Sequence, residues 1–246
     1  MSKVVLITGV LGGIGSLIAE GFKSKGYFVV GLDINNNINK INNSDLFIKF
    51  DLNQYCINQE YRNEMNKVLD EKVPNLNVLI NNAAVQILGK IDEIKLEDWT
   101  QTLNVNLTAP FLLSQLFLNK LANTKGCIIN ISSIHQQLTK KRFVSYATSK
   151  AALVGLTKSM SVDLQGKVRV NSISPAAIDT PMLHDGFNND EKKIDELNSI
   201  HPLQRIGKPR EVAKLTLLLA EDELGFINGA NIQIDGGISN VLKDLD

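Results

Sequence analysis

Apolar residues along this chain fall into short runs that alternate with longer segments of helical periodicity. The runs predict seven strands, at residues 3–8, 27–32, 46–50, 77–81, 127–132, 169–173 and 231–234. The helical segments are residues 13–25, 59–71, 96–123, 145–165, 191–198 and 209–220. Most of the strand runs are continuously apolar, which is typical of strands covered on both faces. The alternation predicts an α/β fold with a doubly wound parallel sheet in a three-layer αβα arrangement.

Two segments interrupt this regular alternation. Residues 34–45 are rich in Asn and barely long enough for a parallel crossover, so we expect an irregular connection or one helical turn there. Residues 180–205 carry turn residues and a short charged helix. Long connections of this kind are commonly lids or binding elements, so we expect this segment to contact the substrate.

The composition limits the classes of protein to which the chain can belong. Its 246 residues contain no Gly/Ser or Pro-rich linker, which favours one Rossmann-type domain over residues 1–246. The 26 basic and 26 acidic side chains argue against nucleic acid or an anionic membrane as partner. The two cysteines and three histidines offer neither a disulfide framework nor a metal cluster. We expect a soluble cytoplasmic protein with a small-molecule substrate and no bound metal.

A glycine-rich loop follows the first predicted strand. It spans residues 8–15 and includes Gly9, Leu11, Gly12, Gly13, Ile14 and Gly15. Glycines permit a tight turn, and the start of the next helix offers free N–H groups to a pyrophosphate. The alternative is a glycine-rich turn without a ligand. The strand–loop–helix context favours a dinucleotide site.

Asp33 ends the second predicted strand, eighteen residues after Gly15. A carboxylate at this place typically accepts hydrogen bonds from the adenosine ribose and repels a 2′-phosphate. Neither the glycine loop nor the residues just after Asp33 contain Arg or Lys. This favours NAD over NADP, while the alternative is that Asp33 caps a turn.

Tyr146 and Lys150 stand one helical turn apart on one face of a predicted helix. An ammonium beside a phenol lowers the pKa of the phenol, which suits a general acid or base. The spacing alone is common by chance. Its context strengthens it, because Ser132 and Ser133 end a strand that opens on the side of the glycine loop.

Pro110 lies inside the long helical segment 96–123. A proline has no N–H for the carbonyl four residues back, which belongs to Asn106. We expect a kink there that presents an ordered water at Asn106, and the alternative is a kink with no chemical role.

These motifs together resemble the short-chain dehydrogenase/reductase family over essentially the whole chain. The matching positions are the loop 8–15, Asp51-Leu52, Asn81-Asn82-Ala83-Ala84, Val105-Asn106, Ser133, Tyr146, Lys150, residues 175–181 and Asp235-Gly236-Gly237. The resemblance implies that Tyr146 is the general acid/base, that Lys150 holds the nicotinamide ribose and that Ser133 orients the reacting oxygen. It also implies that Asn106 supports a water-linked proton relay.

The resemblance assigns cofactor contacts to further residues. Asp51 and Leu52 would flank the adenine, Asn82, Ala83 and Ala84 would lie along the cofactor, and Pro175, Ile178 and Thr180 would contact the nicotinamide. Two positions depart from the family pattern, because Ala84 and Ala176 stand where glycine is usual.

The substrate is less well defined by the sequence. The segments 177–181 and 201–209 resemble aldose dehydrogenases, whereas Gln86 and His135 resemble hydroxybutyrate dehydrogenases, in which such residues hold a carboxylate. Phe143 occupies the place where those enzymes have a lysine, and Lys140, Lys141 and Arg142 read as a solvated surface run. His184 is a further candidate substrate contact, and His135 is alternatively a packed histidine.

The resulting expectation is an NAD-dependent oxidoreductase that acts on a small secondary alcohol or ketone, a sugar or polyol first. The alternatives are a hydroxy-acid dehydrogenase, a β-ketoacyl thioester reductase and, remotely, a dinucleotide sensor without catalysis. The resemblance also implies a homo-oligomer, a tetramer or dimer, with the segments 96–123 and 145–165 as candidate interfaces.

Overall fold

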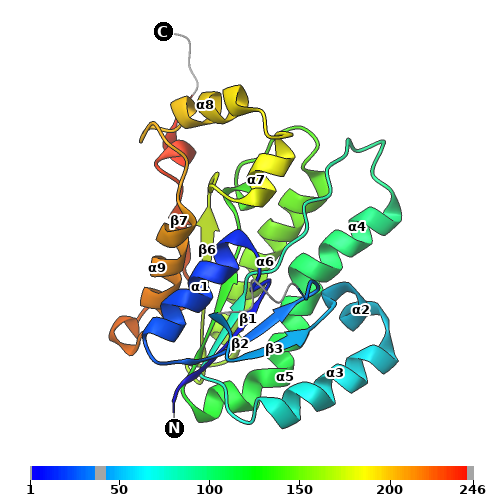
Figure 1. The fold of residues 1–246 in the computed structure, drawn as a ribbon, viewed down its shortest axis with the longest axis vertical. Coiled ribbons are helices and arrows are strands. Elements are labelled where there is room, and N and C mark those ends of the chain that lie inside the picture. Colours follow the sequence, from blue (N-terminus) through cyan, green and yellow to red (C-terminus); the bar gives the residue numbers. More distant parts are fainter. Residues whose placement is uncertain (1, 37–42, 243–246) are drawn as a thin grey trace.

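A computed structural model describes residues 2–36 and 43–242 and contains one seven-stranded sheet between two layers of helices (Figure 1). The strands are β1 Val4–Thr8, β2 Phe28–Asp33, β3 Leu46–Lys49, β4 Val78–Asn81, β5 Cys127–Ile131, β6 Arg169–Pro175 and β7 Asn231–Ile234. All pair in parallel, in the order β3-β2-β1-β4-β5-β6-β7. The predicted doubly wound, single-domain Rossmann-type fold is confirmed.

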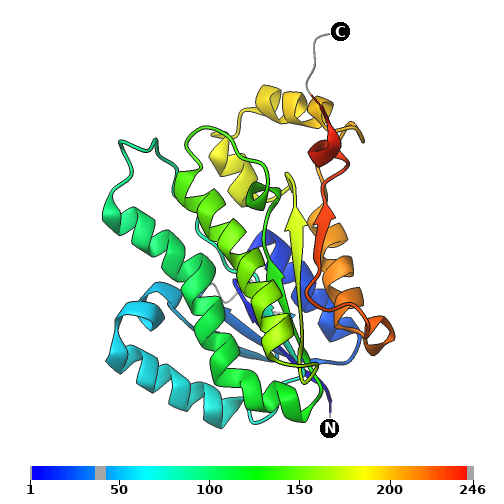
Figure 2. The same ribbon diagram turned by 180° about the vertical axis from the view of Figure 1, so that it is seen from behind.

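The helices lie at α1 Gly13–Ser24, α2 Leu52–Ile57, α3 Gln59–Lys72, α4 Leu96–Leu103, α5 Ala109–Asn123, α6 Val144–Asp163, α7 Pro181–Gly186, α8 Glu191–Ile200 and α9 Pro209–Ala220. Helices α1 and α9 cover one face of the sheet, and α4, α5 and α6 cover the other (Figures 1 and 2). Side chains of β1 alternate between the layers, with Val5 and Ile7 facing α1 and Leu6 facing α5. This explains why the strand reads as continuously apolar.

The strand order reverses between β1 and β4. From β1 the chain builds the sheet outward through β2 and β3, and it then returns to place β4 on the other side of β1. In open parallel sheets, ligands bind in the crevice at the carboxyl ends of the strands where the order reverses. The fold therefore puts a binding crevice between the end of β1, which carries the glycine loop, and the end of β4.

Two short helices were not expected from the sequence. Asp51 accepts hydrogen bonds from the backbone amides of Asn53 and Gln54 and so begins α2. The hydroxyl of Thr180 accepts from the Leu183 amide, and Pro181 occupies the first turn of α7. Both starts carry ordinary capping residues. The segment 180–205 is therefore largely helical. Half of the crossover at 34–45, residues 37–42, lies outside the described residues.

The predicted helix over residues 96–123 is interrupted by a π-helical turn at Asn104–Thr108. Ala109, which directly precedes Pro110, donates its amide hydrogen to the carbonyl of Asn104, five residues back. Because Pro110 has no N–H, the regular ladder cannot continue through it. The irregularity expected near Asn106 is present and takes the form of a widened turn, which is often found at functional sites.

No helix in the described ranges is long and apolar enough to cross a membrane.

Candidate active site

The glycine loop is shaped by close contact with the end of β4. Gly9 has a φ of +66°, and a Cβ on it would lie 2.8 Å from Cα of Ala83. A Cβ on Gly15 would lie 2.1 Å from the Gly9 carbonyl oxygen and 2.8 Å from Nδ2 of Asn82. Gly9 is therefore required for its positive φ and for space, and Gly15 is required for space.

Hydrogen bonds join this loop to β4. The Thr8 hydroxyl accepts from the amides of Asn82 and Ala83 at 3.0 Å each. In return, Nδ2 of Asn82 donates to the carbonyls of Thr8 and Gly9, also at 3.0 Å. Asn82 and Ala83, which were expected along the cofactor, therefore lie directly beside the glycine loop.

The end of β2 meets the same loop. Oδ2 of Asp33 accepts from the Leu11 amide at 3.0 Å, and Oδ1 accepts from the Asn35 amide at 3.0 Å. The carboxylate is only partly buried. Asp33 thus caps the turn after β2 and also contacts the glycine loop.

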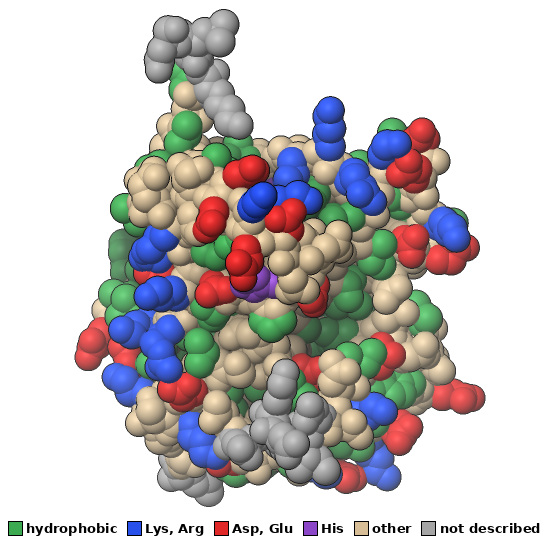
Figure 3. All heavy atoms as spheres, turned by 45° about the horizontal axis from the view of Figure 1, so that its top comes forward, with side chains coloured by type: hydrophobic (Ala, Val, Ile, Leu, Met, Phe, Trp, Pro, Cys, Tyr) green, Lys and Arg blue, Asp and Glu red, His purple; other side chains and the backbone are tan. Residues whose placement is uncertain are grey.

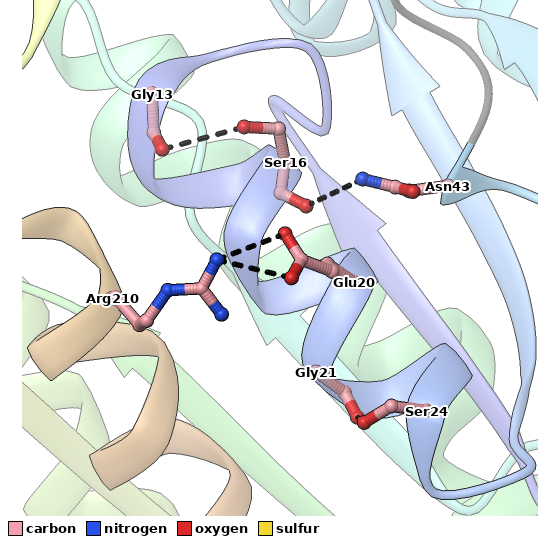
Figure 4. A network of polar contacts seen from close by, with 7 residues as sticks. All are labelled: Gly13, Ser16, Glu20, Gly21, Ser24, Asn43 and Arg210. Carbon is pink, nitrogen blue, oxygen red and sulfur yellow. Dashed lines mark hydrogen bonds and ion pairs between the residues drawn. The ribbon is translucent and has the colours of Figure 1, made fainter.

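Helix α1, which follows the loop, is anchored on its outer side (Figure 4). Arg210 of α9 donates to both carboxylate oxygens of Glu20, at 3.1 and 3.4 Å, and Nδ2 of Asn43 donates to the Ser16 carbonyl at 3.2 Å. An exposed ion pair of this kind contributes little to stability. The contacts connect α1 to α9 and to the residues just before β3.

The other predicted cofactor residues occupy two places around this crevice. Thr180 lies next to the loop, since a Cβ on Gly13 would be 3.0 Å from its Cγ2. Ile178 is buried, and the residues beside it pair with Gly207 ahead of α9. Pro175 ends β6, and Asp51 and Leu52 begin α2 just beyond β3. These residues thus follow the carboxyl ends of β3 and β6, on either side of the glycine loop in the strand order.

Ser133, Tyr146 and Lys150 come together at the carboxyl end of β5, and all three are buried. Nζ of Lys150 lies 5.7 Å from the centre of the Tyr146 ring and donates to the Ile131 carbonyl at 2.8 Å. The Ser132 hydroxyl donates to the Lys150 carbonyl at 3.0 Å. Helix α6 is thus held against β5 at the level of the predicted catalytic residues.

Burial controls the protonation of this group. It raises the pKa of Tyr146 to about 12, and a hydrogen bond with the Ser133 side chain opposes that rise. Burial lowers the pKa of Lys150 to about 7. With protein groups alone, the pKa of Tyr146 is therefore shifted opposite to the expected direction, because desolvation outweighs the Ser133 hydrogen bond.

The side chain of Asn106 bridges α6 and the loop that follows β4. Its Oδ1 accepts from the Val85 amide at 2.9 Å, and its Nδ2 donates to the Val85 carbonyl and to the Ser149 hydroxyl at 3.0 Å each. Ser149 in turn donates to the Tyr146 carbonyl at 2.7 Å. Asn106 is thereby connected to the Tyr146 backbone through Ser149. The sequence does not predict this connection.

The candidate substrate residues divide into two groups. The His135 ring packs on Phe143 at 4.5 Å and meets the Tyr146 ring edge-on at 6.0 Å between centres. Oε1 of Gln86 lies 4.0 Å from where a Cβ of Gly186 would be, so it faces α7. His184 is on α7 itself, where its Nε2 lies 2.7 Å from Oδ1 of Asp179.

The face that carries the strand ends is hollowed near its centre, with hydrophobic side chains in the hollow (Figure 3). Within the described ranges, no three His, Cys, Asp or Glu side chains are grouped to hold a metal ion.

Comparison with known proteins identifies the family. A family model described as enoyl-(acyl carrier protein) reductase matches residues 9–239. The 3-oxoacyl-(acyl-carrier-protein) reductase of Thermotoga maritima is 34% identical over 242 residues, which cover 96% of this chain and 97% of that protein. The chain belongs to the short-chain dehydrogenase/reductase family. Short-chain dehydrogenases/reductases are oxidoreductases that bind nicotinamide dinucleotides, so the expected enzyme class is confirmed at this level.

Two solved short-chain dehydrogenase structures closely match this fold. The ligand-free aldohexose dehydrogenase of Thermoplasma acidophilum superposes with a TM-score of 0.90 at 32% identity, covering 100% of this chain and 97% of that one. A 4-hydroxyisoleucine dehydrogenase complexed with NADH gives a TM-score of 0.89 at 30% identity, covering 98% and 100%.

Proposed function

We propose that this protein transfers a hydride between NAD and a small secondary alcohol or its ketone, with Ser133, Tyr146, Lys150 and Asn106 performing the reaction. The observation that supports this best is the convergence of Ser133, Tyr146 and Lys150 at the end of β5, beside a glycine loop that fits a dinucleotide. A sensor without catalysis would have no need for this set of residues.

Each of these four residues has a separate role in the proposed reaction. When bound, the nicotinamide ring supplies the hydride acceptor or donor. Ser133 would hold the reacting oxygen of the substrate, and Tyr146 would exchange a proton with that oxygen. Lys150, when protonated, would stabilise the Tyr146 phenolate. Asn106 holds Ser149 and hence the Tyr146 backbone, and its place beside the π-turn suits the proposed water-linked relay.

The cofactor preference follows from Asp33. Its carboxylate is at the mouth of the glycine loop, where it would accept hydrogen bonds from the ribose hydroxyls and repel a 2′-phosphate. This supports NAD over NADP and the oxidation of the alcohol as the working direction.

The substrate class is drawn from three similarities. A sugar or polyol is supported by the likeness to aldohexose dehydrogenase. A hydroxy acid and a β-ketoacyl thioester are the alternatives, for which the 4-hydroxyisoleucine dehydrogenase and the acyl-carrier-protein reductase are the corresponding relatives. We expect contacts of the substrate segment 180–205 to contribute to the choice among them.

We also propose that the protein is a cytoplasmic homo-oligomer. Phe111 on α5 and Val162 on α6 are apolar and exposed, at 44% and 78%, on the helices that were expected to form interfaces. Light scattering coupled to size-exclusion chromatography distinguishes a monomer from a dimer or tetramer.

The function is tested by following NADH formation with aldoses, polyols, hydroxy acids and hydroxyacyl thioesters. Tyr146→Phe should abolish turnover and retain NADH binding, measured by fluorescence, because only the exchangeable proton is lost. Full activity in this variant would refute the mechanism. NADH binding without turnover on any substrate would favour the sensor.

A further inference from the structure

Lys140 lies against two aromatic rings that come from different parts of the chain. Its Nζ is 4.6 Å from the centre of the Phe143 ring and 5.5 Å from that of Phe187. Lys140 belongs to the loop between β5 and α6, whereas Phe187 directly follows α7. A cation over an aromatic ring is attracted by the ring's quadrupole, so the ammonium is held between the loop and the end of α7. Lys140 is exposed, as expected of a solvated surface run, but its ammonium also lies against these two rings.

The Lys140 ammonium has no carboxylate partner in the described residues, where the ion pairs involve other side chains. Partial burial lowers the pKa of Lys140, although much of the residue remains exposed. A cation that has lost part of its water without gaining an anion is poised to bind one.

The ammonium is also close to the reacting end of the site. The Phe143 ring centre is 5.9 Å from that of Tyr146, and Nζ of Lys140 is 4.6 Å from the Phe143 ring centre. Nζ therefore lies within about 10.5 Å of the Tyr146 ring centre, as these two distances require. A substrate with its hydroxyl near the Tyr146 ring would therefore need to span no more than about this distance to bring its other end to Lys140.

Two more side chains lie close to residues of this group. His135 contacts both Phe143 and Tyr146, and burial lowers its pKa, which the Lys140 charge lowers further. Oε1 of Gln86 lies 4.0 Å from where a Cβ of Gly186 would be, and Gly186 directly precedes Phe187. Tyr146 and Lys140 are thus connected through the rings of Phe143 and His135, and Lys140 supplies the positive charge of this group.

We propose that Lys140 is a specificity-determining residue that binds a carboxylate of the substrate, so that the substrate is a small hydroxy acid, a sugar acid included. This rests on the proposed function, because it places the hydroxyl of that acid at Tyr146. One ammonium suits a monoanion better than a phosphate dianion. In the reaction, the carbon loses its hydride to NAD⁺, the hydroxyl proton passes to the Tyr146 phenolate, and a keto acid and NADH form.

The test compares hydroxy acids with uncharged analogues that keep the secondary hydroxyl. Suitable pairs are 3-hydroxybutyrate with 1,3-butanediol and gluconate with sorbitol, and glycerol 3-phosphate adds a phosphorylated alcohol. The wild-type enzyme should prefer a member with a carboxylate. Lys140→Met should raise KM for that acid by about 10- to 100-fold, the size of a lost charge-assisted hydrogen bond, with little change in kcat.

Matched variants separate this role from general effects of charge. Lys141→Met removes the same charge from the neighbouring exposed residue and should leave the preference unchanged. Lys140→Arg should restore most of the affinity for the acid, and thermal unfolding checks that all three variants fold.

The failures of the two proposals are distinguishable. Turnover of the uncharged alcohols that exceeds turnover of the acids and is insensitive to Lys140→Met overturns the carboxylate role and leaves the proposed function standing. Preference for the phosphorylated alcohol overturns the choice of carboxylate. NADH binding without turnover of any panel member overturns both.

Discussion

The backbone amide of Leu11 donates a hydrogen bond of 3.0 Å to Oδ2 of Asp33. One carboxylate thus both shapes the glycine loop and stands where an adenosine ribose is expected to bind. The two roles can be separated by substitution.

Asp33→Asn keeps an oxygen that can accept from Leu11, while Asp33→Ala removes it. Both lose the negative charge that repels a 2′-phosphate. The ratio of kcat/KM for NAD to that for NADP should fall by about tenfold or more in both variants, as expected for a loss of roughly 1.4 kcal/mol of discrimination. NAD affinity should fall further in Asp33→Ala, because its loop has lost an anchor. An unchanged ratio in both variants would show that Asp33 does not contact the ribose.

Gly15 and Gly21 lie in the same helix and differ in the space around them. A Cβ on Gly15 would overlap the Gly9 carbonyl, whereas one on Gly21 would meet nothing within 4 Å. Gly15→Ala should lower the free energy of unfolding by about 1–3 kcal/mol and weaken NADH binding. Gly21→Ala should raise stability by about 0.5–1 kcal/mol, because alanine favours the helix. Urea unfolding and NADH fluorescence titrations measure both effects, and equal behaviour of the variants would contradict the loop geometry.

Lys150 should make stability depend on pH. Burial lowers its pKa to about 7, below the ordinary value of 10.5. Between these values the unfolded chain binds more protons than the folded chain, so the folded state gains stability as pH rises from 7 toward 10.5. Relative to Lys150→Met, the wild-type free energy of unfolding should increase by about 1 kcal/mol per pH unit in this window. Parallel pH profiles of the two proteins, measured without cofactor by urea unfolding, would contradict the shift.

Asn106 should matter for stability as well as for turnover. Asn106→Ala leaves the amide and carbonyl of Val85 without their side-chain partner, at a cost of about 1–3 kcal/mol. Asn104→Ala is the matched control, since Asn104 is less buried and its side chain donates only to Asn53 in the described contacts. Thermal unfolding should show the larger loss for Asn106→Ala. A larger loss for the control would contradict the bridging role.

The strands were predicted well because most of them are short, largely apolar runs. All seven begin and end within two residues of the expected positions, and β1, β4 and β5 are buried along almost their whole length. The short helices α2 and α7 were missed, although Asp51 and the Thr180-Pro181 pair carry capping signals. Six-residue helices are too short for an apolar period to reveal.

The presence of Pro110 predicts that the helix expected over residues 96–123 is interrupted, but it does not predict the form of the interruption. A proline shows that the ladder must break, but not whether the result is a sharp kink or a widened turn. Here the side chain of Asn106 bonds to Val85 and Ser149, and the break is a π-turn.

The sequence by itself determined the family, the parallel sheet and the identity of the candidate catalytic residues, because these depend on local order and on spacing along one helix or loop. The tertiary structure decided which distant residues share a surface. Lys140 reads as one of three neighbouring basic residues, and only the approach of Phe187 from the end of α7 places it against two rings. The pKa values of Tyr146 and Lys150 were likewise decided by burial, which depends on everything packed around them.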